Sequence, residues 1–526
     1  MPEEKVRLCR LIRPGNPRGR VNIYTQFTKR TTNDGLIKLA TIINKLWGWR
    51  AEVIDEENYW GPRDGDGLPD HEMLQHESPA DVVGFYCGLT STIERVWELS
   101  AFYKSQGVIT LGGSWHAHYC PEETLCHNID LVVHGDAELE IVKVFANIDN
   151  GRLLHEGVGG VSYLDGIQVK HILPNLEDAG QMRDCDSRLL LMENRLSCEQ
   201  LTVLPYSDFG LLRFGKIRFY PIGRIRGCSM GCKFCTVKTG PRWANAEWLF
   251  GLVNWLVETR KARWFFIVDD RSEEDLQGTI KFFEMVAAKY GRRLRFTVQM
   301  RLPAARNAVL MDTMKRAGVR SACIGIESPI DEELNAMGKG LTSKSMVELV
   351  RVWHRYSIRV HEMFIFGFPV SESDKSMSTA GRVKAYKRFI GRSRADFIQV
   401  LSPIPLPGSE LREELKKAGR LFPLEVAPWN KYDGNFVLIK PVDGLSLREL
   451  QSAHTKIMAW FYGPFSFLKM IYRTFYLVVD YFLRGWDPWR SDWGRDVVVW
   501  LGHSVVNRWL STRENEKHLE SLEKKD

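Results

Sequence analysis

Three cysteines within eight residues constrain this chain more than any other feature. Cys228, Cys232 and Cys235 follow the spacing Cys-x3-Cys-x2-Cys in the stretch Arg-Gly-Cys-Ser-Met-Gly-Cys-Lys-Phe-Cys-Thr. Thiolates this close in sequence converge on one centre only if the backbone wraps around it, and Gly227 and Gly231 give the chain that freedom. The spacing therefore predicts a loop that surrounds a metal centre.

The chemistry of that centre follows from the number of thiolates. Iron–sulfur clusters are held by cysteine thiolates, and a [4Fe–4S] cube needs four ligands where this loop offers three. One iron would stay open for a small molecule. A zinc site is the alternative, but zinc usually takes a fourth Cys or His at a regular spacing and this neighbourhood has no His. Three cysteines gathered by chance are a second alternative. With ten Cys in 526 residues the chain is not a disulfide scaffold, which favours a reducing, cytoplasmic setting.

The cysteine triplet resembles that of the radical S-adenosylmethionine (radical SAM) superfamily, in which an aromatic residue precedes the last cysteine. Phe234 fits that position. The resemblance implies that Cys228, Cys232 and Cys235 ligate the cluster and are catalytic, and that Phe234 lies in the cofactor site. It also implies that the open iron binds the amino and carboxylate groups of S-adenosylmethionine. An external donor of the flavodoxin or ferredoxin type would then supply the electron that cleaves the cofactor to a 5′-deoxyadenosyl radical.

Alternating strands and helices surround the loop, as a partial TIM barrel of this superfamily requires. Short apolar runs each end in polar or glycine-rich residues, and helical patterns lie between them. We predict six strands at about 216–225, 264–268, 294–298, 321–324, 360–365 and 396–400, with helices at 245–261, 275–290, 307–317 and 343–356. Functional residues should lie at the carboxyl ends of these strands.

The predicted strand ends carry further cofactor contacts by resemblance. Phe266-Ile-Val-Asp269-Asp270 matches an element that lies against the methionine end of the cofactor, although Arg271-Ser272 stand where the family usually has Asn and an aromatic residue. Gly-Ile-Glu-Ser at 325–328 makes Glu327 the best catalytic and cofactor-binding candidate outside the cysteines. Gln299 and Arg301, which follow another strand, are further candidates. The alternatives are a helix start for the paired aspartates and a barrel-rim ion pair for Glu327.

The first 150 residues predict a different unit. Strands are expected at 5–12, 50–54, 80–86, 108–111 and 130–133, with helices at 34–47 and 93–106. This alternation predicts a doubly wound, Rossmann-like parallel sheet, in which ligands lie outside the carboxyl ends of the strands. A glycine-rich turn at Gly112-Gly113 would let a backbone approach a phosphate.

The combination of motifs in this unit resembles the cobalamin-binding domain found at the front of many radical SAM enzymes. The motifs are Asp-Val-Val-Gly, Leu-Gly-Gly-x-x-His-Ala, Pro-Glu-Glu-Thr-Leu and Asp-Leu-Val-Val-x-Gly-x-x-Glu, and the resemblance covers about residues 5–425, including a hairpin at 160–169. This group of enzymes includes methylases of unactivated carbon and phosphorus centres, anaerobic cyclases of porphyrin esters, and enzymes that act on hopanoids or other lipids. The cobalamin contacts that it implies are Thr90, Ser91, Gly112, Gly113, Ser114 and Glu138.

One departure concerns cobalt. Cobalamin domains often carry Asp-x-His-x-x-Gly after the second strand, whereas this chain has Asp55-Glu-Glu-Asn-Tyr-Trp-Gly61, with no His before His71. The lower face of the cobalt would then be open or bound to water. A domain that keeps the fold and has lost cobalamin is the alternative. We interpret His116 and His118 as ordinary polar-site histidines.

Charge and aromatic residues gather near the two ends of the chain. Residues 1–30 hold eight Lys or Arg and two Glu, so they contribute +6 of the net charge of +7. This basic strip could meet an anionic cofactor, a nucleic acid or a lipid surface, or it is a solvated edge. Six Trp lie between 460 and 509, interleaved with basic residues. That mixture suits a membrane interface, and the alternative is a helical cap on the barrel.

These observations give an α/β fold class and a four-part organisation. We predict a cobalamin-binding-like domain at 1–150, a linker with a β-hairpin at 151–205, a radical SAM partial (β/α)6 barrel at 206–425 and an aromatic-rich helical region at 426–526. No secretory signal or spanning segment is evident, so we expect a cytoplasmic protein, with peripheral contact to the inner membrane face as an extension.

The expected function is methylation of an unactivated carbon in a hydrophobic, lipid-like small molecule. By resemblance, the 5′-deoxyadenosyl radical removes a hydrogen from the substrate, methylcobalamin donates the methyl group, and a second S-adenosylmethionine recharges cobalt. A radical cyclase or C–C bond-forming enzyme without methyl transfer is the alternative. An electron-transfer or sensing protein is disfavoured because it needs no barrel, and no nucleic acid partner is expected.

Overall fold

The computed structural model describes residues 6–16, 29–172, 195–370, 377–441 and 446–523, except 465–467, 469–470, 473–474, 477–478, 480–481 and 484–485. The chain divides into two compact units, each described here by itself. The first comprises residues 1–17, 27–230 and 236–286, and the second comprises residues 18–26, 231–235 and 287–526.

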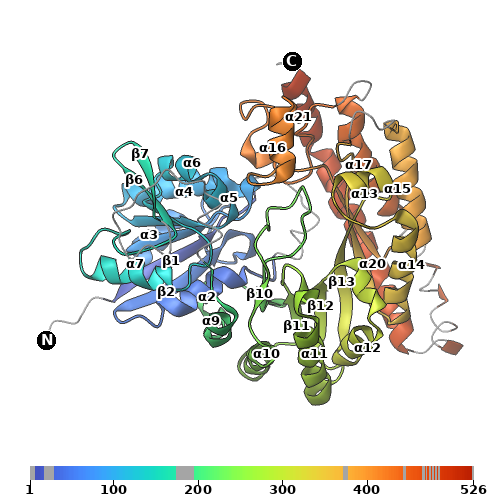
Figure 1. Ribbon diagram of the computed structural model, residues 1–526, viewed down its shortest axis with the longest axis horizontal. Coiled ribbons are helices and arrows are strands. Elements are labelled where there is room, and N and C mark those ends of the chain that lie inside the picture. Colours follow the sequence, from blue (N-terminus) through green and yellow to red (C-terminus); the bar gives the residue numbers. More distant parts are fainter. Residues whose placement is uncertain are drawn as a thin grey trace. The chain divides into compact units, whose positions relative to one another are not determined.

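A seven-stranded sheet in the first unit, coloured blue to teal in Figure 1, has the order β2-β1-β3-β4-β5-β6-β7. Its first five strands are parallel, β5 and β6 are antiparallel, and β6 and β7 form the predicted hairpin. The strands are β1 (Arg7–Arg13), β2 (Trp49–Asp55), β3 (Val82–Tyr86), β4 (Ile109–Gly113), β5 (Leu131–Val133), β6 (Val161–Asp165) and β7 (Gln168–Ile172).

The helices confirm that this sheet is doubly wound. The strand order reverses direction after β2, and right-handed crossovers therefore place the next helices on the opposite face. Helix α2 contacts α7, so these two share one face. The helices of this part are α2 (Asp34–Ile43), α3 (His71–Glu77), α4 (Ile93–Ser105), α5 (Trp115–Tyr119), α6 (Pro121–Cys126), α7 (Glu140–Asp149) and α9 (Cys198–Val203).

Helix α2 is shorter than its amphipathic pattern predicts. It begins after Asn33, whose side chain accepts a hydrogen bond from the Leu36 backbone N–H. It ends at Asn44 and not near Trp47, because the Asn44 side chain turns to accept the Ala51 backbone N–H at 3.1 Å. Trp47 is left 85% exposed.

The basic residues of the N-terminal strip that lie in β1 are paired with carboxylates, whereas Lys29 and Arg30 are exposed. Arg10 is fully buried in β1 and donates to Glu52 and to the carbonyl oxygens of Leu74 and Ser78. Arg13 forms an ion pair with Asp55 at 3.1 Å, and Arg7 forms one with Asp149. Arg10 is therefore no part of a basic surface, and carboxylates neutralise the charges of Arg13 and of the partly exposed Arg7. Residues 17–28 of the strip lie outside the described residues.

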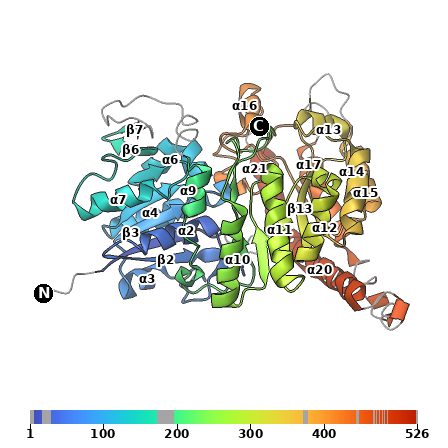
Figure 2. The same ribbon diagram turned by 60° about the horizontal axis from the view of Figure 1, so that its bottom comes forward.

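Six further parallel strands alternate with helices along the chain. In the first unit β8 (Tyr220–Ile222) pairs with β11 (Trp264–Ile267). In the second unit β13 (Val319–Glu327) pairs with β12 (Arg295–Gln299) and with β14 (Arg359–Ile365), which pairs in turn with β15 (Phe397–Leu401). The intervening helices are α10 (Ala246–Arg260), α11 (Leu276–Tyr290), α12 (Ala308–Ala317), α13 (Asp331–Ala336), α14 (Ser343–Arg355) and α15 (Thr379–Ser393) (Figure 2). The predicted barrel units are confirmed.

Two of these strands differ from their predicted bounds. The run at 216–225 is not one strand, because β8 ends at Ile222 and a short antiparallel ladder of β9 (Ile225–Arg226) with β10 (Arg242–Trp243) follows. The fourth barrel strand is longer than 321–324, since β13 continues through a bulge to Glu327.

The C-terminal region is helical, as predicted. Its elements are α16 (Glu410–Lys417), α17 (Leu447–Phe461), α20 (Trp486–Ser511) and α21 (Glu514–Glu523), and α17 packs against both α20 and α21. Among the described residues, no helix is both long and apolar enough to cross a membrane.

Candidate cofactor sites at two sheet edges

The segment that enters the cysteine loop is held by two aspartates at the end of β11. Asp269 Oδ1 accepts the backbone N–H groups of Arg224 and Ile225 at 2.7 and 2.9 Å. Asp270 Oδ2 accepts the N–H of Gly227 at 2.7 Å. Burial raises the pKa of both carboxyl groups. Both predicted cofactor residues therefore position the backbone that carries Cys228, and the first explains why β8 stops.

The start of the loop is further fixed by its glycine and by a carboxylate. Gly227 has a φ of +86°, and a Cβ there would lie 2.6 Å from the carbonyl oxygens of Thr239 and Gly240. The Cys228 N–H donates to the Thr239 carbonyl at 3.0 Å. Glu274 accepts from both the backbone N–H and the hydroxyl of Ser229, at 2.7 and 2.9 Å. Burial raises the pKa of the Cys228 thiol.

The residue that departs from the family pattern has a place in the same arrangement. Arg271 forms ion pairs with Glu273 and Glu274, at 3.1 and 3.0 Å, and donates to the Ser229 hydroxyl at 3.1 Å. The residue that follows it, Ser272, donates to Asp269. Arg271 and Ser272 thus support the loop in place of the usual Asn and aromatic residue.

The second half of the loop belongs to the second unit. Cys232 and Cys235 are half-buried, and the Cys235 N–H donates to the Cys232 carbonyl at 3.1 Å. Lys233 donates its N–H to Met337 and accepts from the N–H of Leu411. Phe234 packs in an apolar cluster, edge-on to Phe368 at 6.4 Å, so it supports the loop by packing.

Glu327 ends strand β13 in an uncommon conformation. Its φ is +66°, in the left-handed region that non-glycine residues seldom occupy, directly after a bulge in the ladder. Its carboxylate accepts from Lys339 Nζ at 2.8 Å, and both side chains are buried. A Cβ at position 325 would lie 2.1 Å from that carboxylate, so Gly325 makes room for it. Strain of this kind is concentrated at functional sites.

Two other candidates lie near the same strand end. Arg301 Nη2 donates to the carbonyl oxygen of Lys339 at 2.8 Å, which ties it to the ion pair of Glu327. Gln299 ends β12, in register with Cys323 of β13. Lys339 itself was not foreseen. The signal that could have indicated it is a lysine between two glycines, Gly338 and Gly340, which both have positive φ.

At the edge of the first sheet, Gly112 and Gly113 are the last two residues of β4, not a turn as predicted. They pair with β3 on one side and β5 on the other. The turn falls on Ser114, whose φ of 82° and ψ of −174° lie in a region otherwise restricted to glycine. A Cβ on Gly113 would lie 3.3 Å from the Val133 carbonyl oxygen.

Buried hydroxyl groups lie close to this edge. Thr90 and Ser91 form a short 3-10 turn after β3, η2 (Thr90–Thr92), and both are buried. The Thr90 hydroxyl lies 3.3 Å from His116 Nδ1 at the start of α5. The predicted residues Thr90, Gly113 and Ser114 therefore belong to neighbouring parallel strand ends of one sheet.

Glu138 does not stand free at that edge. Its carboxylate pairs with Arg226, which also pairs with Asp136 at 2.8 Å, and Asp136 pairs with Arg242 at 2.6 Å. Both arginines lower the pKa of Asp136, against the effect of its burial. Arg226 directly precedes Gly227 and Cys228, so this charge cluster ties the end of the first sheet to the start of the cysteine loop.

The segment that lacks the cobalt-ligating His is occupied by carboxylates. Glu56 pairs with Arg95 at 2.9 Å and with His71 at 3.2 Å, and these contacts lower the pKa of Glu56 to about 2 despite its burial. Glu57 accepts the backbone N–H of Asn16 at 2.6 Å. His71 is also bound to the Tyr103 hydroxyl at 2.8 Å.

Comparison with known proteins identifies relatives of the chain and of its cysteine-loop segment. Residues 222–378 match the radical SAM superfamily. This segment, which includes the cysteine triplet, is a radical SAM domain. The chain is 24% identical over 414 residues to bacteriochlorophyllide d C-12(1)-methyltransferase of Chlorobaculum tepidum, covering 77% of each chain. It is also 24% identical over 328 residues to the anaerobic magnesium-protoporphyrin IX monomethyl ester cyclase of Synechocystis, covering 59% of this chain and 60% of the cyclase.

Among solved structures, the chain is similar to TsrM, a radical S-adenosylmethionine methyltransferase from Kitasatospora setae with cobalamin and a [4Fe-4S] cluster bound. The TM-score is 0.64 at 15% identity, with 95% of this chain and all of TsrM covered. At that identity the likeness shows a shared fold, and it extends over the N-terminal sheet as well as the barrel strands.

Proposed function

We propose that this radical SAM enzyme is a cobalamin-dependent methylase of an unactivated carbon in a hydrophobic small molecule. The observation that carries the proposal is that a fold like that of TsrM runs along the whole chain, with the cysteine triplet at the start of the barrel. The relative that methylates a bacteriochlorophyllide supports a methyl-transfer reaction.

The donor set of the loop fits a [4Fe–4S] cluster with one open iron. Cys228, Cys232 and Cys235 would be its ligands, since they supply three soft thiolates in one short loop. Asp270 and Glu274 fix the backbone on either side of Cys228. They hold neutral N–H groups and do not compete with the thiolates for iron.

The end of β13 fits the zwitterion of S-adenosylmethionine. Glu327 would accept from the amino group, and Lys339 and Arg301 would face the carboxylate. The Glu327–Lys339 pair is already desolvated, so a ligand with one positive and one negative group would exchange one ion pair for two.

The edge of the first sheet fits a large, mostly neutral ligand such as cobalamin. Gly112 and Gly113 leave the end of β4 without side chains, and Ser114 holds a strained turn beside the buried hydroxyl group of Thr90. Glu138 would act through Arg226 as a positioning residue. The segment Asp55–Gly61 contains no histidine that could hold cobalt.

When bound, these groups supply a hydrogen-abstracting radical and a transferable methyl group, and the protein orients them. The chain's own contribution is positional: the aspartates of β11 fix the loop, and Glu327 and Lys339 fix the cofactor's charged end. An external one-electron donor of the flavodoxin or ferredoxin type completes the scheme.

The decisive test is anaerobic reconstitution with iron, sulfide, S-adenosylmethionine and a reductant, with and without hydroxocobalamin. We expect 5′-deoxyadenosine in both cases, and S-adenosylhomocysteine only with cobalamin, because methyl transfer to cobalt produces it. Failure to form 5′-deoxyadenosine would refute the enzyme class. Failure to take up cobalamin would refute the methylase.

A cyclase is the second candidate. The cyclase of Synechocystis is as similar in sequence over its shorter match. A cyclase outcome predicts 5′-deoxyadenosine together with a substrate product of unchanged carbon count. Mass spectrometry of the product separates the two reactions.

We further propose that the aromatic segment before α20 contacts lipid and supports a lipid-like substrate. Phe475, Phe482 and Leu483 are 84%, 78% and 78% exposed, an unusual cluster for a soluble surface. The N-terminal arginines of β1 no longer support this, since they are paired internally.

A flotation assay on anionic liposomes tests the lipid contact. The full chain should float at low salt, and a Phe475→Ser/Phe482→Ser variant should lose most of that binding. Ile167→Ser is the matched control, because Ile167 is 98% exposed in the β6–β7 hairpin and should not contribute. A full chain that stays in the soluble fraction would show that the segment does not bind lipid.

A further inference from the structure

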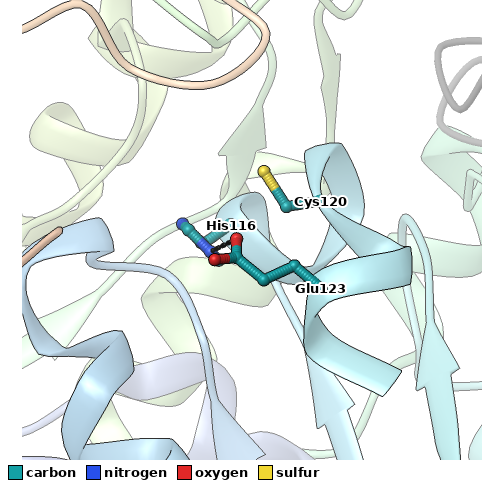
Figure 3. Close-up of side chains that lie close together, drawn as sticks. All are labelled: His116, Cys120 and Glu123. Carbon is teal, nitrogen blue, oxygen red and sulfur yellow. Dashed lines mark ion pairs between the residues drawn. The ribbon is translucent and has the colours of Figure 1, made fainter. Parts of the chain in front are cut away.

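A histidine, a cysteine and a glutamate gather after strand β4, on the segment that forms α5 and α6. His116, Cys120 and Glu123 each offer one ligand atom, and these atoms all lie within 4.8 Å of one another (Figure 3). His116 lies in α5, Cys120 lies at the break between α5 and α6, and Glu123 lies in the first turn of α6. Neither the cluster loop nor the strand-end residues of the proposed function include this group.

We infer that His116, Cys120 and Glu123 form a site for a zinc-class divalent cation. The ligands are an imidazole, a thiolate and a carboxylate, the set that zinc takes most readily, whereas magnesium and calcium prefer oxygen alone. Three protein ligands leave one coordination position open for water or a small donor.

The distances leave room for such an ion. His116 Nε2 and Glu123 Oε2 lie 3.5 Å apart. Nitrogen and oxygen ligands about 2.0–2.1 Å from zinc at a tetrahedral angle are about 3.3 Å from each other, and a sulfur at about 2.3 Å lies about 3.6 Å from the nitrogen. The His116–Glu123 pair is therefore already near the spacing of two zinc ligands, and the Cys120 sulfur lies within 4.8 Å of both atoms.

The surroundings of His116 orient the correct nitrogen. His116 Nδ1 lies 3.3 Å from the hydroxyl oxygen of Thr90, which can accept a hydrogen bond from Nδ1–H. The other ring nitrogen, Nε2, then faces Glu123 with its lone pair. His116 is 1% exposed, whereas Cys120 and Glu123 are half-buried, so one side of the group is reachable from solvent. On binding zinc, the Cys120 thiol would release its proton to solvent and ligate the metal as the thiolate.

The backbone gives the cysteine its place. Helix α5 ends at Tyr119 and Pro121 opens α6, so Cys120 occupies the junction, with φ −132° and ψ 56°. Its N–H still donates to the His116 carbonyl at 2.8 Å, which keeps the two side chains together across the break.

The neighbouring His118 shows that not every histidine here is a candidate ligand. His118 Nδ1 lies 2.8 Å from His134 Nδ1, and His134 Nε2 lies 2.6 Å from the Ser162 hydroxyl. Ser162 in turn contacts His171 at 2.6 Å. This buried chain occupies the opposite side of the same segment and is used for structure, because each member is a partner of the next.

Zinc binding to the cluster-loaded protein tests the site. Iron already occupies the cysteine loop in that form, so equilibrium dialysis against zinc followed by elemental analysis should give about one zinc per chain. Cys120→Ala and His116→Gln should lose it, and Glu123→Gln should bind at least about tenfold more weakly. Cobalt(II) should give a thiolate charge-transfer band in the wild-type protein that is missing in Cys120→Ala.

Two matched controls isolate the three ligands. Cys126→Ala removes an exposed thiol of the same helix α6, and Glu122→Gln removes the adjacent carboxylate. Both should keep wild-type zinc binding. If His116→Gln fails to fold, the half-buried Glu123 and Cys120 still decide the question.

Less than about a fifth of an equivalent of zinc in the wild-type protein, or equal binding in Cys120→Ala and Cys126→Ala, would overturn the inference. The result is independent of the proposed function, because it measures zinc and not the cleavage of S-adenosylmethionine. A protein without radical activity could still bind zinc here, and an active one could fail to.

Discussion

Ser114 at the end of β4 and Glu327 at the end of β13 both have positive φ, 82° and 66°, and each terminates a strand of a parallel sheet. Each is reached through glycine: Gly112 and Gly113 precede the first, and Gly325 lies two residues before the second. The two edges are thus built alike in the backbone.

Their side chains differ. The edge at Ser114 presents glycines, a buried hydroxyl group and histidines, whereas the edge at Glu327 holds a buried ion pair with Lys339. A neutral edge suits a bulky ligand recognised by hydrogen bonds and shape, and a charged pair suits a zwitterion. The two edges therefore share a backbone conformation, and the charge of their side chains determines which kind of ligand each would bind.

The largest expected effect separates the two edges completely. Cys232→Ala removes one cluster ligand, so 5′-deoxyadenosine formation should fall by about 1000-fold or more. Cys228→Ala and Cys235→Ala should behave alike, and cobalamin uptake should persist in all three. Cys126→Ala is the control and should keep about four irons per chain. Residual cofactor cleavage in Cys232→Ala would remove the basis for the cluster assignment.

The converse change acts on the first edge. Gly113→Trp places a large ring at a position where even a Cβ would lie 3.3 Å from the Val133 carbonyl oxygen. The affinity for cobalamin, followed by its absorbance, should fall about 100-fold, and the absorption spectrum of the cluster should not change. Gly65→Trp is the matched control in the same unit, since no atom lies within 4 Å of its Cβ position. Equal loss in both variants would mean that the ring acts on folding.

A smaller effect is expected from the ion pair. Glu327→Gln should raise the dissociation constant of S-adenosylmethionine about tenfold, because a charge-assisted contact becomes a neutral one. Iron content should not change. Equilibrium dialysis with labelled cofactor measures the effect, and Glu332→Gln, at the start of α13, is the control. Lower unfolding stability without weaker binding would assign Glu327 to a purely structural rim pair.

The smallest effect concerns a carboxyl group away from both edges. Burial raises the pKa of Glu362, in the middle of β14, from 4.5 to about 8, and Ser393 donates to it at 3.1 Å. The folded state therefore holds a proton that the unfolded state releases. Stability from this group is full below pH 4.5 and is lost as the pH rises toward 8.

Urea unfolding across that range checks the sign. Glu362→Gln should flatten the decline and stabilise the protein at pH 8 by on the order of 1 kcal/mol or more relative to wild type. A wild-type stability that rises between pH 5 and pH 8 at the same rate as in Glu362→Gln would contradict the assignment.

Much of the fold could be predicted because its signals are local. The period of apolar residues identified β11, β12, β14 and β15 to within a residue or two, and Asn residues marked helix starts, as at Asn245 and Asn307. The errors fell where a distant side chain intervened. Asp269 lies 44 residues from Ile225, yet it ends β8 by accepting that residue's N–H.

The candidate site divides in the same way. The three cysteines were evident because a cluster loop needs its ligands close in sequence. The roles of Asp270, Glu138 and Lys339 were not, because their partners lie 43, 88 and 12 residues away. The assignment of individual strand-end residues to cofactors stays a prediction that the variants above can test.

By itself, the sequence determined the order of strands and helices, the cysteine loop and the absence of a histidine from the segment Asp55–Gly61. These depend on residue type and short spacing, which the chain carries explicitly. Only the tertiary structure decided which charges are free. Arg10 and Arg13 looked like a basic surface and are paired inside β1, while His116, Cys120 and Glu123 came together beside a strained turn. The physical reason is that burial and pairing depend on which surfaces meet in three dimensions, and no local pattern encodes that meeting.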